Sequence, residues 1–322
     1  MMITDCLKIN LRKAAVIGCG FVGSSIAFAL MQSGLFSELI LIDADTDRAE
    51  GEALDISHGT PFAKPMKIYS GTYQDITDAA VIIITAGANQ KPDESRLDLV
   101  NKNTRIMRSI VGEIMNHGCE GILLIVSNPV DILTYEALKI SGLPKNRVIG
   151  SGTVLDTGRL KSELAEHLGV DSRSIHAFII GEHGDSEIAA FSSANVSGVP
   201  LNAVCEMRGY YHHEAAMLEI AQTVKNSAYE IIEKKKATYY GIAMAVRRIC
   251  EAIVRDEKSI LPVSVMLDDQ VYGLQDVVLS MPAMIGARGA EGLMPITLNE
   301  EEQAQLKKSA QLLKEVIDGI NI

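Results

Sequence analysis

The chain has 322 residues, 47% of them hydrophobic, and a formal net charge of −11. This length allows two domains with separate cores, and this hydrophobic content excludes a largely disordered chain. The acidic balance argues against nucleic acid or an anionic membrane surface as a partner. The longest apolar runs, such as residues 122–126, are too short to span a bilayer, and the first residues do not resemble a secretion signal.

The cysteines are dispersed along the chain and odd in number. They are Cys6, Cys19, Cys119, Cys205 and Cys250. Such a set indicates reduced thiols rather than a disulfide framework, and no group of cysteines and histidines has the spacing of a zinc site. We therefore expect a cytoplasmic protein without a bound metal.

A glycine-rich turn near the N-terminus connects a strand to a helix. Residues 14–17 predict a buried strand, residues 18–23 read GCGFVG, and an alanine-rich helix is expected over residues 24–32. A second apolar strand, residues 39–42, ends at Asp43, twenty residues after the last glycine. This order of strand, glycine turn, helix, strand and acid is typical of dinucleotide-binding proteins.

Each glycine of this turn has a physical role in that arrangement. Gly18 permits the tight turn, Gly20 lets the backbone approach a pyrophosphate, and Gly23 allows close packing of helix on strand. The N-terminus of the helix then faces the phosphates. Asp43 can accept hydrogen bonds from ribose hydroxyls and would repel a 2′-phosphate, so the predicted cofactor is NAD. The alternative for Asp43 is a solvated carboxylate at a strand end.

Strands and helices continue to alternate up to about residue 150. Helices are predicted over residues 45–58, 96–117 and 130–141, and strands over 67–69, 80–85, 121–126 and 147–149. This alternation predicts an α/β fold with a Rossmann-type, doubly wound parallel sheet. Ligands bind such sheets at the carboxyl ends of the strands, which places residues 86–88 and 127–129 on the cleft with the glycine turn.

The pattern becomes less regular after residue 151. We place there the boundary between an NAD-binding Rossmann domain, residues 1–151, and a C-terminal α+β substrate-binding and catalytic domain, residues 152–322. Further helices are predicted over residues 154–168, 206–235, 240–255 and 299–319, with strand-like segments over 177–180, 259–267 and 273–280.

One turn in the second half has the composition of a catalytic loop. An apolar strand, residues 177–180, leads into Gly181-Glu182-His183-Gly184-Asp185. The two glycines suggest a backbone that needs freedom while the imidazole is held at a cleft edge. Imidazole titrates near neutrality and therefore suits proton transfer. In isolation His183 is also consistent with an ordinary surface histidine.

Two further polar groups are expected to face the same cleft. Asp156 and Arg159 lie near a helix start at a spacing of i, i+3, which puts both on one helix face. An ordinary helical ion pair, contributing about 0.3–0.5 kcal/mol, is the alternative. Residues 89–96, NQKPDESR, follow a strand end and form a long loop that could close over the cleft as a lid.

Long strings spread over nearly the whole chain resemble the L-lactate dehydrogenases. They are GCGFVGSS, TAGANQKPDESRLDLV, SNPVDILTYE, GSGTVLDTGRL, IIGEHGDSE and ATYYGIA. The broader family also contains malate dehydrogenases and other 2-hydroxyacid dehydrogenases. The resemblance implies reversible hydride transfer between NADH and pyruvate to give L-lactate, as in the last step of fermentative glycolysis.

The resemblance also implies the catalytic roles. His183 would protonate the substrate carbonyl oxygen, and Asp156 would hold the imidazole and stabilise its charged form, as a carboxylate partner does. Arg159 would bind the substrate carboxylate through two parallel hydrogen bonds. Arg96 would polarise the carbonyl as negative charge develops.

Other positions match those that contact ligands in the family. Asn128 would line the site between nicotinamide and substrate, and Thr238 would lie beside the substrate pocket. The matches to cofactor-contacting positions are Val22, Arg48, Gly87, Ala88 and Ser127.

Gln90 is the residue most informative about the substrate. Malate dehydrogenases of the family have arginine there, which pairs with the second carboxylate of oxaloacetate. A neutral glutamine leaves that carboxylate without a counter-ion, at a cost on the order of 2–5 kcal/mol. We therefore expect pyruvate as the substrate, with the neighbouring Lys91 pointing elsewhere.

Regulation and assembly are implied less directly. Many bacterial relatives are activated by fructose 1,6-bisphosphate, bound between subunits by an arginine and a histidine. His176 matches the histidine, whereas Lys161 replaces the arginine and can bind phosphate only as a point charge. The resemblance further implies a homotetramer. Lys236 stands where the family usually has glycine, and we expect it to affect local backbone freedom.

Two other functions are consistent with parts of the sequence. The chain could act on malate or a bulkier 2-hydroxy acid, which Gln90 disfavours. It could also bind a dinucleotide without turnover, but such a protein need not retain Arg96, Asp156, Arg159 and His183 together.

Overall fold

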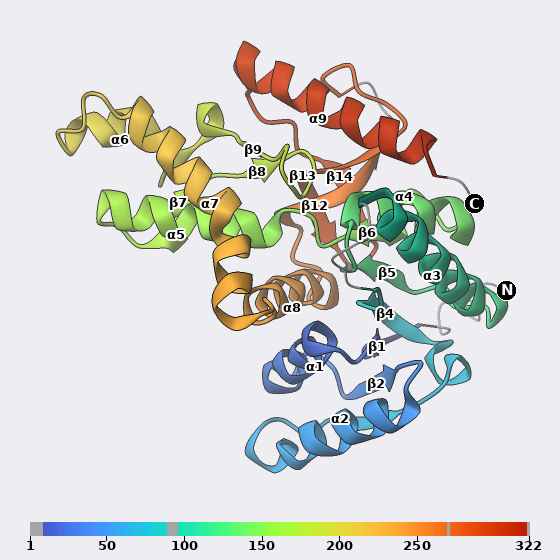
Figure 1. Ribbon diagram of the computed structural model, residues 1–322. Helices are drawn as coiled ribbons and strands as arrows, with labels where there is room; N and C mark the ends of the chain where they lie inside the picture. The colour runs from blue at the N-terminus through green and yellow to red at the C-terminus, as the bar shows by residue number, and fades with distance from the viewer. Residues whose placement is uncertain (1–8, 89–95, 269–270, 321–322) are drawn as a thin grey trace, which may run out of the picture.

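One large sheet organises the computed structural model, which describes residues 9–88, 96–268 and 271–320 (Figure 1). In spatial order its described strands are β14 (Gly289–Leu293), β13 (Val277–Gly286), β12 (Ser259–Leu267), β6 (Val148–Gly150), β5 (Ile122–Ile125), β4 (Ala79–Ile84), β1 (Asn10–Ile17), β2 (Glu38–Ile42) and β3 (Lys67–Ser70). The strands from β6 to β3 pair in parallel, whereas β12, β13 and β14 pair antiparallel. Because Ser264 of β12 pairs with Gly150 of β6, the sheet continues across residue 151.

Helices cover both faces of the sheet. The helices are α1 (Phe21–Ser33), α2 (Thr46–His58), α3 (Arg96–Asn116), α4 (Val130–Ser141), α5 (Val154–Leu168), α6 (Leu201–Met207), α7 (Glu214–Lys235), α8 (Tyr240–Val254) and α9 (Glu300–Asp318). Alternate residues of β1 point to opposite faces. Ala14 and Val16 enter a core with α1, α2, α8 and α9, and Ala15 and Ile17 enter a second core with α3 and α4. The fold is therefore the doubly wound Rossmann arrangement with an α/β C-terminal part.

Short strands position the histidine turn. Three of them, β7 (Ile175–His176), β10 (Asn195–Val196) and β11 (Val199–Pro200), form a small sheet, and β8 (Ile179–Ile180) pairs with β9 (Ile188–Ala189). The 3-10 helices are η1 (Thr60–Phe62), η2 (Tyr73–Ile76), η3 (Lys145–Arg147), η4 (Ser172–Ser174) and η5 (Phe191–Ser193). A third core of α5, α6 and α7 side chains supports these elements. His183 lies in the turn that connects β8 to β9.

Most predicted elements are confirmed, and three predictions for the second half are wrong. Residues 206–235 are not one helix: α6 ends at Met207 and α7 begins at Glu214, because Gly209 has a φ of +86° that no right-handed helix continues through. The strand predicted over residues 177–180 is shorter in the structure, where β8 begins at Ile179 and β7 precedes it. The segment over residues 273–280 becomes a strand only from Val277, and β14 was not predicted. Within the described ranges, no helix is long and apolar enough to cross a bilayer.

Candidate active site

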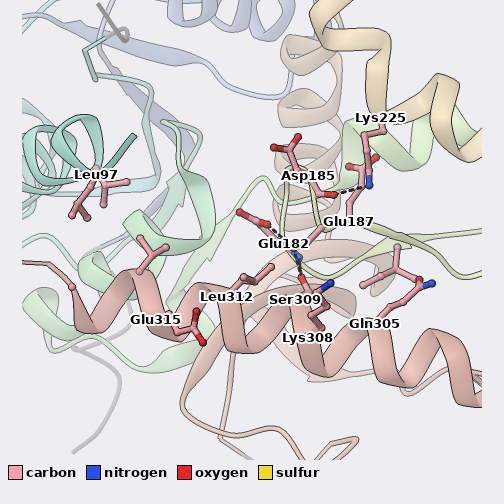
Figure 2. A pocket seen from close by; sticks show the side chains of 15 residues that line it. Leu97, Glu182, Asp185, Glu187, Lys225, Gln305, Lys308, Ser309, Leu312 and Glu315 are labelled. Carbon is pink, nitrogen blue, oxygen red and sulfur yellow. Dashed lines mark hydrogen bonds between the residues drawn. The ribbon is translucent and has the colours of Figure 1, made fainter. Parts of the chain in front are cut away.

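A cavity of about 740 Å³ lies between the histidine turn and helix α9 (Figure 2). The turn supplies Glu182, Asp185 and Glu187 to its wall, α7 supplies Lys225, and the start of α3 supplies Leu97. The cavity therefore borders the neighbours of His183 in the turn, whereas His183, Asp156 and Arg159 themselves are not in its wall.

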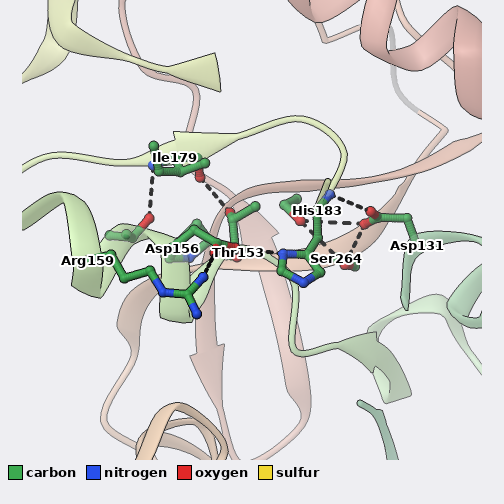
Figure 3. Close-up of polar contacts among 10 residues, drawn as sticks. Asp131, Thr153, Asp156, Arg159, Ile179, His183 and Ser264 are labelled. Atoms are coloured by element: carbon green, nitrogen blue, oxygen red, sulfur yellow. Dashed lines mark hydrogen bonds and ion pairs between the residues drawn. The ribbon is translucent and has the colours of Figure 1, made fainter. Parts of the chain in front are cut away.

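Asp156 joins His183 and Arg159 (Figure 3). Its Oδ2 lies 2.6 Å from His183 Nδ1, and its Oδ1 accepts a hydrogen bond of 2.8 Å from Arg159 Nη1. Asp156 is buried in the first turn of α5, and Arg159 follows one turn later. With Nδ1 engaged by the carboxylate, Nε2 is the imidazole nitrogen left to serve a substrate.

The charges in this cluster favour a protonated imidazole. Burial lowers the pKa of His183, but the carboxylates of Asp156, Asp131 and Glu187 together raise it to about 9. Burial also works against an ionised Asp156, yet His183 and Arg159 hold the pKa of this carboxyl below its usual value. At neutral pH the pair is therefore an imidazolium held by a carboxylate, a state that can give a proton to an oxygen.

Asp131, which sequence reasoning missed, anchors the backbone of the turn. It is buried at the start of α4, where its Oδ2 accepts 2.7 Å from the N–H of His183 and its Oδ1 accepts 2.6 Å from the hydroxyl of Ser264. Burial raises the pKa of Asp131 to about 6, although these hydrogen bonds oppose the shift. The only sequence signal was its place in the string SNPVD, because its partners lie 52 and 133 residues away.

Hydroxyl groups fasten the same turn to its neighbours. Thr153 Oγ1 donates 2.5 Å to the carbonyl of Ile179, and the N–H of Ile179 donates 2.8 Å to Thr157 Oγ1, which ties β8 to α5. The buried hydroxyl of Ser309 in α9 accepts 2.9 Å from the N–H of Glu182. The spacing between His183 and Asp156 is thus set by hydrogen bonds on both sides of the imidazole.

The glycine turn fits a dinucleotide. A Cβ on Gly23 would lie 1.8 Å from the carbonyl oxygen of Gly18, and a Cβ on Gly18, whose φ is +100°, would lie 2.5 Å from the nitrogen of Ala86. A Cβ on Gly20 would meet nothing within 4 Å, and Gly20 is the residue that precedes α1. Two glycines are therefore required by packing, while the third leaves open space at a helix N-terminus, where a phosphate binds well.

Asp43 and Arg48 hold the glycine turn in place. Asp43 Oδ2 accepts 2.5 Å from the N–H of Cys19 and its Oδ1 accepts 2.9 Å from the N–H of Asp45. Arg48 Nε donates 2.9 Å to the carbonyl of Cys19. A carboxylate has about four lone-pair positions, so Asp43 keeps acceptor capacity for ribose hydroxyls. Val22 is half-buried beside this turn.

A second residue missed by sequence reasoning, Asn103, joins the neighbouring turns. This buried side chain of α3 accepts 2.7 Å from the N–H of Ala88 and donates 2.8 Å to the carbonyl of Asn128. Ser127 Oγ donates 2.7 Å to the carbonyl of Ala86. The turns after β4 and β5, which include Gly87, therefore form one hydrogen-bonded rim next to the glycine turn.

The remaining predicted residues lie apart from this cluster or outside the described structure. Gln90 is outside the described residues, and of Arg96 only the backbone is described, as the first residue of α3. Thr238 is half-buried between α7 and α8. Lys161 is half-buried on α5, where burial lowers the pKa of its ammonium group, and His176 is exposed on β7.

Comparisons with known families agree with this geometry. Residues 12–150 match the NAD binding domain of the lactate/malate dehydrogenases, and residues 153–321 match the alpha/beta C-terminal domain of the same enzymes. The chain therefore belongs to the lactate/malate dehydrogenase family, and its first part is an NAD-binding domain.

Individual relatives match over nearly their whole length. The chain is 51% identical to an L-lactate dehydrogenase of Acetivibrio thermocellus, covering 97% of this chain and 98% of the relative. It is 52% identical to L-lactate dehydrogenase 1 of Clostridium acetobutylicum, covering 96% and 98%. Among solved structures, a ligand-bound minor L-lactate dehydrogenase from Enterococcus mundtii matches with a TM-score of 0.93 and 45% identity, covering 97% and 99%.

Proposed function

We propose that this chain is an NAD-dependent L-lactate dehydrogenase that interconverts pyruvate and L-lactate. The observation that carries the proposal is the 2.6 Å contact between His183 and a buried Asp156 that also binds Arg159. The L-lactate dehydrogenases to which the chain is similar over nearly its full length support the same activity. When bound, the reduced nicotinamide supplies the hydride to the substrate carbonyl carbon.

The side chains supply positioning and the proton. His183 donates the proton on Nε2 to the carbonyl oxygen of pyruvate, while Asp156 orients the ring and stabilises its charge. Arg159 has one Nη on Asp156, and its other N–H groups bind the substrate carboxylate. Arg96, at the start of α3, polarises the carbonyl. In the proposed complex Asn128 lies between the nicotinamide and the substrate, and Thr238 lies beside the substrate.

The two proposed roles, cofactor binding and acid/base chemistry, are assigned to the two parts of the chain. Residues 1–151 bind the cofactor and residues 152–322 carry the acid/base chemistry. The proposed cofactor-binding residues are Gly18, Gly20, Val22, Gly23, Asp43, Arg48, Gly87, Ala88, Ser127 and Asn128. Their support is the glycine turn, with open space at Gly20, and its hydrogen-bonded rim.

Substitution of His183 tests the mechanism. His183→Gln should reduce kcat for pyruvate by about 10²–10⁴-fold, because no group then gives the proton. The fluorescence of bound NADH should still report near-normal cofactor affinity. His58→Gln, at an exposed histidine at the end of α2, is the matched control and should keep full activity. Retained turnover in His183→Gln would remove this residue from the mechanism.

Substrate choice is proposed to depend on Gln90. Gln90→Arg should shift the ratio of kcat/KM for pyruvate and oxaloacetate toward oxaloacetate, since the guanidinium can pair with the second carboxylate. An unchanged ratio would mean that another residue selects the substrate. If the wild-type chain oxidises NADH with neither compound, it is a dinucleotide-binding protein without turnover.

A homotetramer is part of the proposal and has structural support. Helices α1 and α8 pack against each other (Figure 1), and both helices have exposed apolar side chains. Phe21 and Phe28 of α1 are 65% and 48% exposed, and Tyr240 and Met244 of α8 are 68% and 53% exposed. Such a patch is typical of subunit contacts. Phe28→Ser should lower the mass measured by light scattering, and an unchanged mass would place the contact elsewhere.

Activation by fructose 1,6-bisphosphate through Lys161 and His176 is proposed as well. Activity at low pyruvate should rise as the bisphosphate is added, and a flat response would exclude activation.

A cytoplasmic location is supported by Cys19, Cys119, Cys205 and Cys250, which are all buried free thiols.

A further inference from the structure

Glu187 stands behind the catalytic pair but has no role in the mechanism above. Side-chain donor or acceptor atoms of Asp156, His183 and Glu187 all lie within 4.8 Å of one another. The position of Glu187 follows from the turn, because its N–H donates 3.1 Å to the carbonyl of Gly184 and closes the chain back toward His183. A carboxyl group at this distance acts on the imidazole through its charge.

Glu187 also faces solvent-accessible space. It lines the 740 Å³ cavity beside α9 together with Lys225 (Figure 2). Both residues also line a second cavity of about 570 Å³ between α7 and α9. Lys225 is held in place by its Nζ, which donates 2.6 Å to the carbonyl of Asp185. The carboxyl group therefore exchanges protons with solvent while remaining close to His183.

Other charged groups, on several helices and in the turn, surround Glu187 and His183. Within the described residues they are Asp156 and Arg159 of α5, Asp131 of α4, Lys225 of α7, Lys308 of α9, and Glu182 and Asp185 of the same turn. Burial, and then the charge of Asp156, raise the pKa of Glu187 to about 8 against the opposing cations. Glu187 thus becomes negative at the pH at which His183 approaches the loss of its proton.

We propose that Glu187 is a positioning residue that acts through His183, and that its carboxylate extends the upper pH limit of pyruvate reduction beyond the limit that Asp156 and Asp131 would set without it. As the pH rises, the new negative charge on Glu187 keeps the proton on the imidazole, so the acid form of His183 persists into alkaline solution. The inference rests on the proposed acid/base role of His183.

The test compares both reaction directions in Glu187→Gln. Loss of the carboxylate should lower the midpoint of the alkaline limb of kcat/KM for pyruvate by about one pH unit. At pH 9 pyruvate reduction should then fall about fivefold, whereas lactate oxidation, which needs the neutral imidazole, should rise about fivefold at pH 8. A purely structural defect lowers both directions together and leaves the midpoints in place.

Two variants serve as controls. Glu187→Asp keeps the charge and should retain most of the wild-type midpoint. Glu315→Gln removes the same charge from an exposed position on α9 that lines the same cavity, and its midpoint should not move. Coincident alkaline limbs for Glu187→Gln and wild type would overturn the inference, as would a parallel loss of both directions.

A second measurement covers the case of low activity. The rate at which diethyl pyrocarbonate inactivates each enzyme reports the neutral fraction of His183, and its pH midpoint should fall by about one unit in Glu187→Gln. An unchanged midpoint would again overturn the inference. Turnover that survives in His183→Gln would instead contradict the proposed role of His183, so the two failures are distinguishable.

Discussion

The cofactor half and the catalytic half of the molecule are stabilised in different ways. The glycine turn is held mainly from nearby in the sequence, with Asp43 and Arg48 binding the backbone of Cys19 from 24 and 29 residues away. Its more distant support is Thr85, whose Oγ1 donates 2.6 Å to the carbonyl of Gly18 from 67 residues away. The turn of His183 is held by Asp131 and Ser309, which lie 52 residues from His183 and 127 residues from Glu182.

This difference explains why the sequence predicts the supports of the two regions unequally well. In the cofactor half one short segment contains the glycine turn and two of its supports, Asp43 and Arg48. In the catalytic half the two residues of the proposed acid/base pair come from the turn and from α5, while their supports come from α4, β12 and α9. Substitutions in the two regions should therefore differ in how much stability and how much ligand affinity they remove.

Removal of the Asp131 carboxylate should have the largest effect on stability. Asp131→Ala leaves the N–H of His183 and the hydroxyl of Ser264 without their shared acceptor in a buried site. The free energy of unfolding should fall by about 4 kcal/mol, the sum of two buried unsatisfied groups. Urea denaturation measures this loss. Ser264→Ala, which removes only one donor, should cost about 1 kcal/mol; equal losses would mean that Asp131 does not link the two elements.

The glycine turn should separate stability from binding. Gly23→Ala places a Cβ 1.8 Å from a backbone oxygen and should cost about 3 kcal/mol of unfolding free energy. Gly20→Ala meets no atom within 4 Å, so its stability should stay near that of wild type while its affinity for NADH falls. Denaturation and NADH titration measure the two effects. Normal NADH affinity in Gly20→Ala would place the pyrophosphate elsewhere.

Elements could be predicted from the sequence where the residues of one segment determine its structure. Helix α5 and strand β12 were predicted with their observed ends, because apolar periodicity and local end signals specify them. The i, i+3 spacing predicted that Asp156 and Arg159 share one face of a helix, which their ion pair confirms. The proximity of His183 to Asp156 was expected only from the resemblance, since no spacing along the chain brings residue 183 to residue 156.

The missed features are those that depend on distant partners. Asp131 and Asn103 look like ordinary polar residues of helices, and their roles arise only when α4 and α3 pack beside the strand ends. The break between α6 and α7 was missed because polar and charged residues continue through it, although Gly209 marked the place. Tertiary packing, and not local preference, decides such positions.

The raised pKa of His183 predicts a pH-dependent stability confined to the catalytic half. A histidine normally titrates near 6.5, whereas the folded chain holds this imidazole to about 9. The stabilisation is complete below pH 6.5 and is lost as the pH rises through 9. Its size is at most about 3 kcal/mol. Urea denaturation of the cofactor-free protein should show wild type losing this advantage over His183→Gln between pH 6 and pH 10. If the free energies of unfolding of wild type and His183→Gln change with pH in parallel, the pKa of His183 is not raised.

Substitution of Lys236 should change the free energy of unfolding least, and it should increase stability where the other substitutions decrease it. It is a non-glycine residue at φ +70° that ends α7, at a place where the resemblance calls for glycine. Lys236→Gly relieves the left-handed strain, which is partly offset by the freedom that glycine adds to the unfolded chain, so stability should rise by about 0.5 kcal/mol. Lys236→Ala keeps the Cβ and should gain nothing. Thermal denaturation of both variants tests this, and equal stability of the two would mean that the backbone here is not strained. If only Lys236→Gly increases stability, the strain at this position depends on local backbone geometry and not on a distant partner. The catalytic half would then also contain a feature that can be predicted from one residue of the sequence.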